Sequence, residues 1–122
     1  MRRTATLAAL LCGLSVLLGA FAAHGLKPRL GEHGQEIWQT GVRYQFLHAL
    51  ALLWLGTTAV RITGPEWIAR LWLAGILLFS GSLYALALGG GSWLGPLTPL
   101  GGLCFLGGWG LLALRLHRST IG

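Results

Sequence analysis

Four long apolar stretches dominate this chain, and each is about as long as a bilayer is thick. They cover residues 4–23, 41–60, 65–88 and 98–114. A helix of about 20 apolar residues crosses the hydrocarbon core of a membrane, which is roughly 30 Å thick. Lipid offers the backbone no hydrogen-bond partners, so spanning segments must be helices or closed barrels. The pattern therefore predicts four membrane-spanning helices.

The composition agrees with a membrane protein and argues against a nucleic-acid partner. Hydrophobic residues make up 54% of the chain and charged residues only 10%, whereas soluble domains average about 25% charged residues. The net charge is +6, but no basic run or basic helix face with interleaved aromatic residues supports nucleic-acid binding. The arginines lie mostly at the ends of the apolar stretches, where they flank membrane helices. We expect the partner of this charge to be the lipid bilayer.

The first apolar stretch has two interpretations. Arg2-Arg3 followed by a leucine-rich run resembles a secretory signal peptide, and Ala20-Phe21-Ala22 fits a small-x-small cleavage site. The alternative is an uncleaved first membrane helix, which the length of about 20 residues permits. We expect the uncleaved helix.

The second stretch carries the most polar side chains into the membrane. Its purely apolar part begins at Phe46 and is too short to span, so the helix has to begin near Gly41. This start brings Arg43, Gln45 and His48 into the span. Residues 32–40, which precede it, are predicted as a separate short helix at the membrane interface.

Four spans place both termini on the same side of the membrane. That side carries Arg2, Arg3, Arg61, Arg70, Arg115 and Arg118, and the other carries Lys27, Arg29 and Arg43. This distribution predicts cytoplasmic termini, because positively charged loops stay inside. The predicted fold class is all-α, an integral membrane four-helix bundle with antiparallel up-down topology, formed as one domain over residues 1–122.

The topology predicts that polar side chains from all four helices gather in the half of the membrane away from the termini. These candidate ligand-binding residues are His24, Arg43, Tyr44, Gln45, His48, Ser80, Ser82, Tyr84 and Thr98. Polar groups inside a bilayer are costly and therefore need partners or a function. They either bond to one another between helices or line a pocket for a small molecule, a lipid, a quinone, a metal or haem.

The chemistry of this cluster favours no catalytic site and no resident cofactor. His24 and His48 are weak candidates for a metal or haem ligand pair, because a metal site needs three or four ligands. The acids Glu32, Glu36 and Glu66 lie near the interfaces, and no nucleophile–base pattern is present. Cys12 and Cys104 lie inside apolar runs and behave as small buried hydrophobic residues; the sequence leaves open whether they are close together.

Four motifs carry a family resemblance that covers the whole chain. They are Gly19-Ala-Phe-Ala-Ala-His-Gly25, Thr40-Gly-Val-Arg-Tyr-Gln-Phe-Leu-His-Ala-Leu50, Phe79-Ser-Gly-Ser-Leu-Tyr84 and Leu94-Gly-Pro-Leu-Thr-Pro-Leu-Gly-Gly102. The chain resembles the bacterial inner-membrane proteins grouped as domain of unknown function 423, whose animal relatives include a small mitochondrial transmembrane protein. The resemblance implies a small multi-pass protein of the bacterial inner membrane with an uncleaved first helix. It implies no catalytic or binding residues.

Two functions remain open. The first is a non-enzymatic accessory or scaffolding protein, which acts within a larger membrane complex or as a homo-oligomer; glycine stripes on the last two spans favour close packing against a partner. The alternative is a binding or transport protein whose pocket in the outer half of the membrane holds a small molecule, lipid, quinone, metal or haem. We expect no enzymatic activity.

Overall fold

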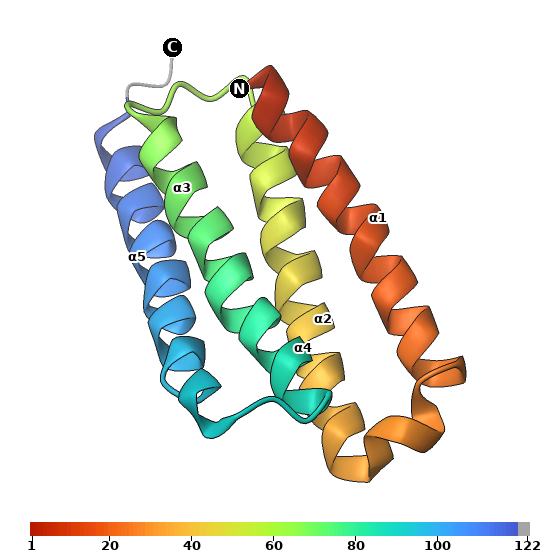
Figure 1. Cartoon of the computed structure of the whole chain (residues 1–122). Coiled ribbons are helices and arrows are strands. Elements are labelled where there is room, and N and C mark those ends of the chain that lie inside the picture. Colours follow the sequence, from red (N-terminus) through yellow and green to blue (C-terminus); the bar gives the residue numbers. More distant parts are fainter. Residues whose placement is uncertain (120–122) are drawn as a thin grey trace.

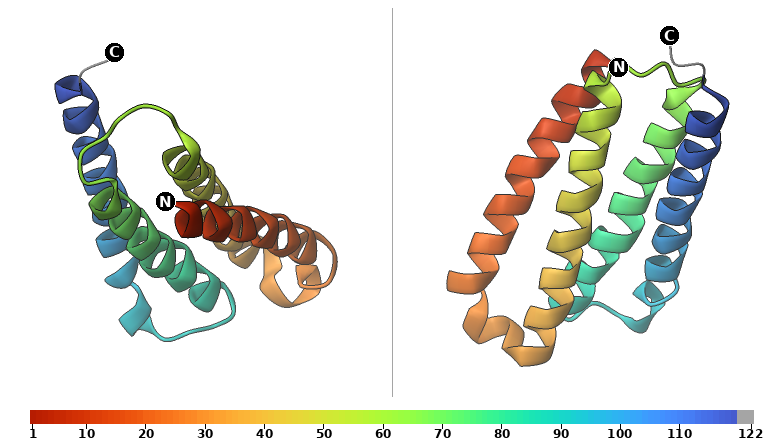
Figure 2. Two further views of the ribbon diagram at one scale, coloured as in Figure 1. Left: turned by 90° about the horizontal axis from the view of Figure 1, so that it is seen from above. Right: turned by 180° about the vertical axis from the view of Figure 1, so that it is seen from behind.

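The structure, a computed structural model, describes residues 1–119 as four antiparallel helical rods side by side in chain order (Figures 1 and 2). The third rod is continuous but contains one π-helical turn, η1. The elements are α1 (Arg2–His24), α2 (Lys27–Thr57), α3 (Pro65–Gly75), η1 (Ile76–Ser80), α4 (Gly81–Ala87), η2 (Ser92–Leu94, a short 3₁₀ turn) and α5 (Leu97–Arg118).

This architecture confirms the predicted all-α membrane bundle. Three helical stretches are long and apolar enough to cross a membrane: Arg2–His24, Pro65–Ala87 and Ser92–Arg118. Helix α2 packs against α1, η1 and α4, and its lower hydropathy comes from the polar side chains that it carries. The start of α1 and the end of α5 lie at the same end of the bundle, called the terminus end (Figure 1). The cytoplasmic location of that end stays a prediction.

Helix α2 differs from the sequence-based expectation. Residues 32–40 do not form a separate interfacial helix; they continue into the span and make one helix that ends at Thr57 rather than at residue 60. The break lies earlier, at Gly31, whose φ of 70° belongs to the left-handed region that glycine adopts without steric cost. The helix ends at Thr57, and the backbone of the next residue, Thr58, is extended, with ψ at 143°.

The other predicted boundaries lie close to the observed ones. The first rod was expected over residues 4–23 and is observed over Arg2–His24. The third was expected over residues 65–88 and is observed over Pro65–Ala87. The last rod is longer than the expected 98–114, because α5 continues through its basic last turn to Arg118. The predicted domain of 1–122 includes residues 120–122, which lie outside the described part of the chain.

The rods form two helical hairpins, α1–α2 and α3–η1–α4 with α5, that pack against each other through α2. The main buried cluster lies toward the end of the bundle that carries the termini, and it contains Ala8, Leu52, Leu55, Ile68, Ala69, Trp72, Ile76, Phe105 and Leu112. Cys12 and Cys104 are both free and lie on α1 and α5, the first and last rods of the row.

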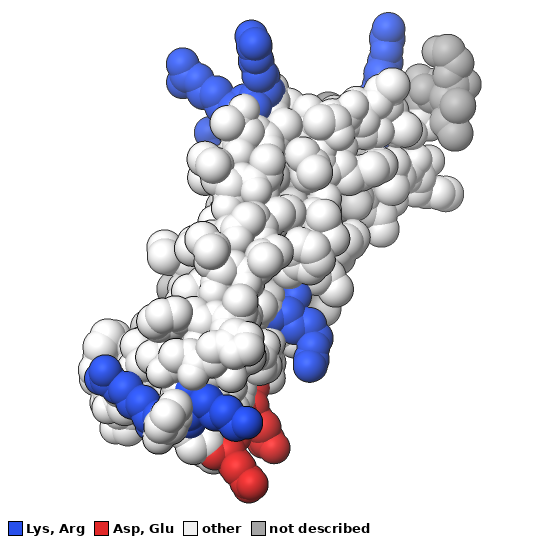
Figure 3. All heavy atoms as spheres, turned by 90° about the vertical axis from the view of Figure 1, so that its right-hand side faces the viewer, with Lys and Arg blue, Asp and Glu red and all other residues white. Residues whose placement is uncertain are grey.

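The surface of the bundle matches a bilayer. Large apolar side chains are exposed along the rods, among them Leu10, Leu17, Leu77, Leu103 and Leu106. On the face drawn in Figure 3, the charged side chains gather mainly at the two ends of the molecule, and all the acidic ones visible there lie at the end opposite the termini. A mostly uncharged flank between charged ends is expected of a bundle that spans a membrane.

Candidate functional site

His48 lies at mid-depth in the bundle. The side chain of Val42 is 3.4 Å from the position that a Cβ would take on Gly19, and Gly56 packs in the same way against Ala5. This register places His48 opposite about Gly13, the midpoint of the 23-residue α1. At 1.5 Å per residue, His48 is therefore about 16 Å from either end of α1. A side chain at this depth has no access to headgroups.

Two hydrogen bonds fix the ring of His48. Its Nδ1 lies 2.8 Å from the carbonyl oxygen of Tyr44, and Trp109 on α5 donates its indole N–H to Nε2 over 3.0 Å. A carbonyl only accepts, so Nδ1 carries the proton and the ring is the neutral Nδ1–H tautomer. Both ring nitrogens are thus engaged, and His48 links α2 to α5 in the middle of the membrane.

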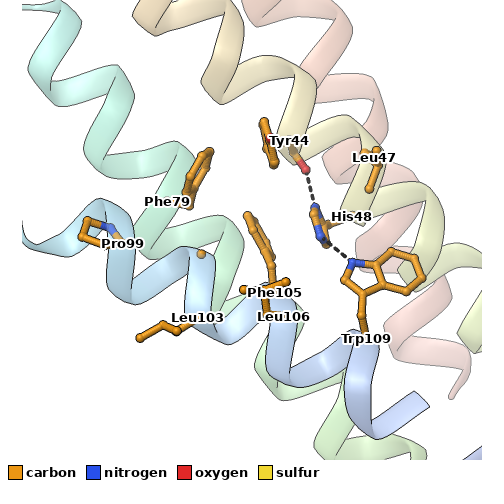
Figure 4. A pocket seen from close by; sticks show the side chains of 10 residues that line it. Tyr44, Leu47, His48, Phe79, Pro99, Leu103, Phe105, Leu106 and Trp109 are labelled. Carbon is orange, nitrogen blue, oxygen red and sulfur yellow. Dashed lines mark hydrogen bonds between the residues drawn. The ribbon is translucent and has the colours of Figure 1, made fainter. Parts of the chain in front are cut away.

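An aromatic-walled groove opens beside His48, between α2 and α5 (Figure 4). The rings of His48 and Phe105 stack with their centroids 3.6 Å apart and an interplanar angle of 11°. The groove has a volume of about 630 Å³. Its lining is almost wholly apolar: Tyr44, Leu47, His48, Phe79, Pro99, Gly102, Leu103, Phe105, Leu106 and Trp109.

The π-helical turn η1 supplies one wall of this groove. In it, the N–H of Gly81 donates to the carbonyl of Ile76, five residues earlier. Phe79 lies in this turn and packs against Tyr44, with ring centroids 4.6 Å apart. Helix α5 comes so close that a Cβ on Gly101 would collide with the backbone nitrogen of Phe79. π-Turns are frequent at functional sites, and this one brings Phe79 to the mouth of the groove.

A second polar group joins three of the rods. The hydroxyl of Tyr84 on α4 donates to the amide oxygen of Gln45 over 2.6 Å, and the amide nitrogen of Gln45 donates to the carbonyl of Leu11 on α1 over 3.1 Å. The rings of Tyr84 and Trp38 are 4.8 Å apart. Gln45 is buried, and its amide is engaged at both ends. This chain of bonds is internal to the bundle.

The predicted serines also bond within the protein. Ser80 is fully buried and donates to the carbonyl of Gly41 on α2 over 2.7 Å. Ser82 donates to the carbonyl of Phe79, so its 2.6 Å contact with Thr98 uses the hydroxyl proton of the threonine. These bonds tie the third rod to α2 and to α5.

The structure separates Arg43 and His24 from these contacts. Arg43 is exposed in a shallow groove between α1 and α2, which Ser15 and Gly19 also line. His24 is exposed at the end of α1, about 16 Å along the axis from the level of His48. The two histidines therefore do not share a site. Among residues 1–119, no group of three or more His, Cys, Asp or Glu side chains could hold a metal ion.

The sequence comparisons decide the family. The model of a family described as "Protein of unknown function (DUF423)" matches residues 18–102. This chain belongs to the DUF423 family.

Full-length relatives carry the same assignment. The chain is 46% identical over 118 residues to a UPF0382 membrane protein of Haemophilus influenzae, with 93% of each chain covered. It is 44% identical over 99 residues to the UPF0382 membrane protein YwdK of Bacillus subtilis, with 79% of this chain and 80% of the relative covered. It is 40% identical over 111 residues to the UPF0382 inner membrane protein YgdD of Escherichia coli, with 87% and 85% covered. No solved structure matches the chain.

Together with the apolar helices, these relatives confirm the predicted family and the location in the bacterial inner membrane as a multi-pass protein. The matched region of the DUF423 chain begins in the second half of α1 and ends in the first turns of α5. It therefore includes all of α2, the π-turn η1 and the Ser82–Thr98 contact.

Sequence reasoning missed several residues that organise this DUF423 structure. Gln35 and Trp38, on the supposed interfacial helix, donate to the carbonyls of Ala22 and Leu18 on α1. With Gln45 they form one face of α2, at spacings of three and seven residues, which is the helical repeat. That stripe of donors could have predicted a single helix. Phe105 and Trp109 were overlooked because an aromatic residue in an apolar span does not reveal by its type whether it faces lipid or lines a groove.

Proposed function

We propose that this protein is a non-enzymatic accessory protein of the inner membrane, which receives a transmembrane segment of a partner in the groove between α2 and α5. One observation carries the proposal. Both ring nitrogens of His48 are bonded to the protein itself, and the groove beside it is apolar, about 630 Å³ in volume and open on the outside of the bundle. A concave groove lets another helix pack closely against the bundle, and close packing drives the association of helices in lipid.

The bonding of the polar residues supports a structural role rather than catalysis. A general base needs a free nitrogen or oxygen within reach of its substrate. His48 uses both ring nitrogens, and Ser80 donates its only proton to Gly41. Ser82 is bonded to Phe79 and Thr98. None of these groups is left poised as a nucleophile and base.

Site-specific photocrosslinking in native membranes tests the accessory role. A photoreactive residue at Leu106, which lines the groove, is compared with one at Leu17 on the lipid-facing side of α1; both side chains are 68% exposed. We expect a discrete protein adduct from position 106 and none from position 17. An adduct of twice the chain's mass would identify the partner as a second copy. Adducts of lipid alone from both positions would contradict the accessory role.

A second candidate is the binding of a membrane-dissolved small molecule, such as a quinone or a lipid, in the same groove. Tyr44 favours it, because this side chain is 39% exposed in the groove and its hydroxyl has no hydrogen-bond partner among residues 1–119. A ligand with an acceptor oxygen would satisfy that hydroxyl, and a flat ring would pack against the aromatic walls. The nearby rings of Phe79 and Phe105 would form those walls.

Native mass spectrometry in mild detergent tests this second role. We expect a retained quinone or lipid of defined mass, and a lower retained fraction in Tyr44→Phe. The variant Leu50→Ala is a control outside the groove, with a side chain of similar exposure. A protein that is released empty, or one whose retained mass is the same in Tyr44→Phe, would contradict ligand binding at Tyr44.

A further inference from the structure

The end of the bundle that holds the termini is strongly basic. It carries the arginines at positions 2, 3, 61, 70, 115 and 118, and Glu66 is the only acidic residue of the chain in this region. The other two acids, Glu32 and Glu36, lie on the first turns of α2, at the opposite end. Charge of one sign gathered at one end creates a potential that attracts anions from outside the chain.

Arg115 occupies a special position within this basic end. It lies in the last turn of α5 and is only partly exposed. Its Nε–H is buried and has no hydrogen-bond acceptor within residues 1–119. One of its terminal nitrogens lies 4.0 Å from the position that a Cβ would take on Gly64, the residue before α3. The stem of Arg115 is thus held in the bundle, while the end of its guanidinium reaches the 58–64 loop.

Two further arginines belong to the same two segments, the 58–64 loop and the last turn of α5. Arg61 lies in the same loop, three residues before Gly64, and Arg118 follows Arg115 by one turn of α5. Both are exposed. Arg70 is engaged elsewhere, since its guanidinium lies over the ring of Trp67, 4.9 Å from the centroid. The last turn of α5 and the 58–64 loop, which Arg115 reaches at Gly64, therefore bring three arginines to the same end of the bundle.

We propose that Arg115, Arg61 and Arg118 form a binding site for the phosphate of an anionic phospholipid in the leaflet next to the termini. A guanidinium binds phosphate oxygens through two parallel N–H donors, which makes arginine the preferred residue for this group. Exposed apolar side chains neighbour these arginines in the chain, Val60 beside Arg61 and Leu114 and Leu116 beside Arg115, so acyl chains attached to the phosphate can meet apolar side chains. Basic pockets at the ends of membrane helices bind anionic headgroups in this way.

The choice of a lipid follows from depth and charge. The three arginines lie where the last turn of α5 and the 58–64 loop leave the bundle, the level of the headgroups in a spanning helix of this length. A zwitterionic headgroup carries a cation beside its phosphate, which three arginines would repel. An anionic headgroup does not, so the site discriminates by charge.

The purified protein in mild detergent is titrated with phosphatidylglycerol or phosphatidylcholine and followed by native mass spectrometry. We expect one phosphatidylglycerol retained in preference to phosphatidylcholine. Arg61→Gln and Arg115→Gln should each weaken its apparent affinity about fivefold, the effect of one arginine near an anionic surface. Arg29→Gln, an exposed arginine at the opposite end of the bundle, is the matched control and should leave the affinity unchanged.

Arg61→Gln keeps the experiment decisive if Arg115→Gln does not fold, because Arg61 is an exposed loop residue. Equal retention of the two lipids would overturn the proposal. So would a loss in Arg29→Gln as large as the loss in Arg61→Gln, since the lipid would then not be bound at the terminus end. The groove between α2 and α5 is not involved, so this result is independent of the accessory role.

Discussion

The two hairpins of the bundle are held together by different means. Between α1 and α2, side chains of α2 donate hydrogen bonds to carbonyl oxygens of α1: Gln35 to Ala22, Trp38 to Leu18, and Gln45 to Leu11. Between the third rod and α5, glycine on one helix receives an aromatic ring or the backbone of the other. The pairs are Gly75 with Phe105, Gly101 with Phe79, and Gly108 with Trp72.

The difference follows from what lipid does to each kind of contact. Apolar side chains gain little by leaving lipid for another helix, so association depends on close packing and on polar bonds. The α1–α2 hairpin relies mainly on polar bonds. A Cβ added to Gly19 would make only an ordinary van der Waals contact with Val42. Gly56 is the exception in this hairpin, because it packs tightly against Ala5. The second hairpin relies mainly on shape, beside one hydrogen bond between Ser82 and Thr98. It should therefore tolerate loss of a hydrogen bond but not gain of a methyl group.

The largest effect should come from adding one methyl group to the second hairpin. In Gly101→Ala the new Cβ meets the backbone of Phe79, which cannot move aside as a side chain could. We expect a loss of about 3 kcal/mol in unfolding free energy, the upper part of the range for overpacking, measured by denaturation with SDS in mixed micelles. Gly110→Ala, where a Cβ has no neighbour within 4 Å, is the control. Equal stability of the two variants would show that shape does not hold this hairpin together.

Removal of the contact between the hairpins should have the next largest effect. His48→Ala leaves the indole N–H of Trp109 without its acceptor and removes the ring that stacks on Phe105. We expect a loss of about 2 kcal/mol, since a donor left unpaired away from water costs about 1–3 kcal/mol. Leu50→Ala, an exposed position two residues away, should cost less. Unchanged unfolding in SDS together with unchanged tryptophan fluorescence would mean that His48 does not link α2 to α5.

A double-mutant cycle measures the polar bond between α4 and α2. Tyr84→Phe removes the hydroxyl that donates to Gln45, and Gln45→Leu removes the acceptor. We expect Tyr84→Phe to cost about 1 kcal/mol and the two changes to be coupled by a similar amount, because polar bonds between membrane helices are worth about 0.6–2 kcal/mol. Strictly additive losses in the unfolding free energy would contradict a direct bond.

The smallest effect should lie in the first hairpin. Trp38→Phe keeps an aromatic ring beside Tyr84 and loses only the bond to the carbonyl of Leu18. We expect a loss of about 0.6 kcal/mol, the average for polar bonds between membrane helices, again by SDS denaturation. Trp93→Phe, whose side chain is 70% exposed, controls for the general effect of replacing a tryptophan. A loss as large as that of Gly101→Ala would remove the difference between the hairpins.

Six of the nine polar residues expected to gather make hydrogen bonds in the bundle, while His24 and Arg43 lie apart from them; ligand binding by these residues stays a prediction. Gln45, His48, Ser80, Ser82, Tyr84 and Thr98 all make contacts between or within the rods, as polar residues in a span must. Their common location was inferred from topology alone, with the second helix expected to begin near Gly41. Helix α2 begins much earlier, so His48 lies at mid-depth and away from His24.

The groove escaped prediction for a different reason. Its walls are aromatic and aliphatic residues of α2, η1 and α5, such as Phe79, Phe105 and Trp109. In a span, residues of this kind face lipid and protein alike, because both surroundings are apolar. Only packing distinguishes Phe105, which is 4% exposed and stacks on His48, from Leu103, which is 64% exposed.

The sequence by itself determined the class of protein, the number of rods and their direction. Lipid imposes helices of a fixed length, and the lengths of the apolar runs show this directly. The tertiary structure decided which polar groups meet, which face of each rod is buried and where the groove lies. These depend on a register between helices set by Gly19, Gly56, Gly101 and Gly108, and no apolar run encodes such a register. Helices in lipid associate through close packing of their surfaces. The shape of such a contact depends on both helices together, so the sequence of one apolar run does not reveal it.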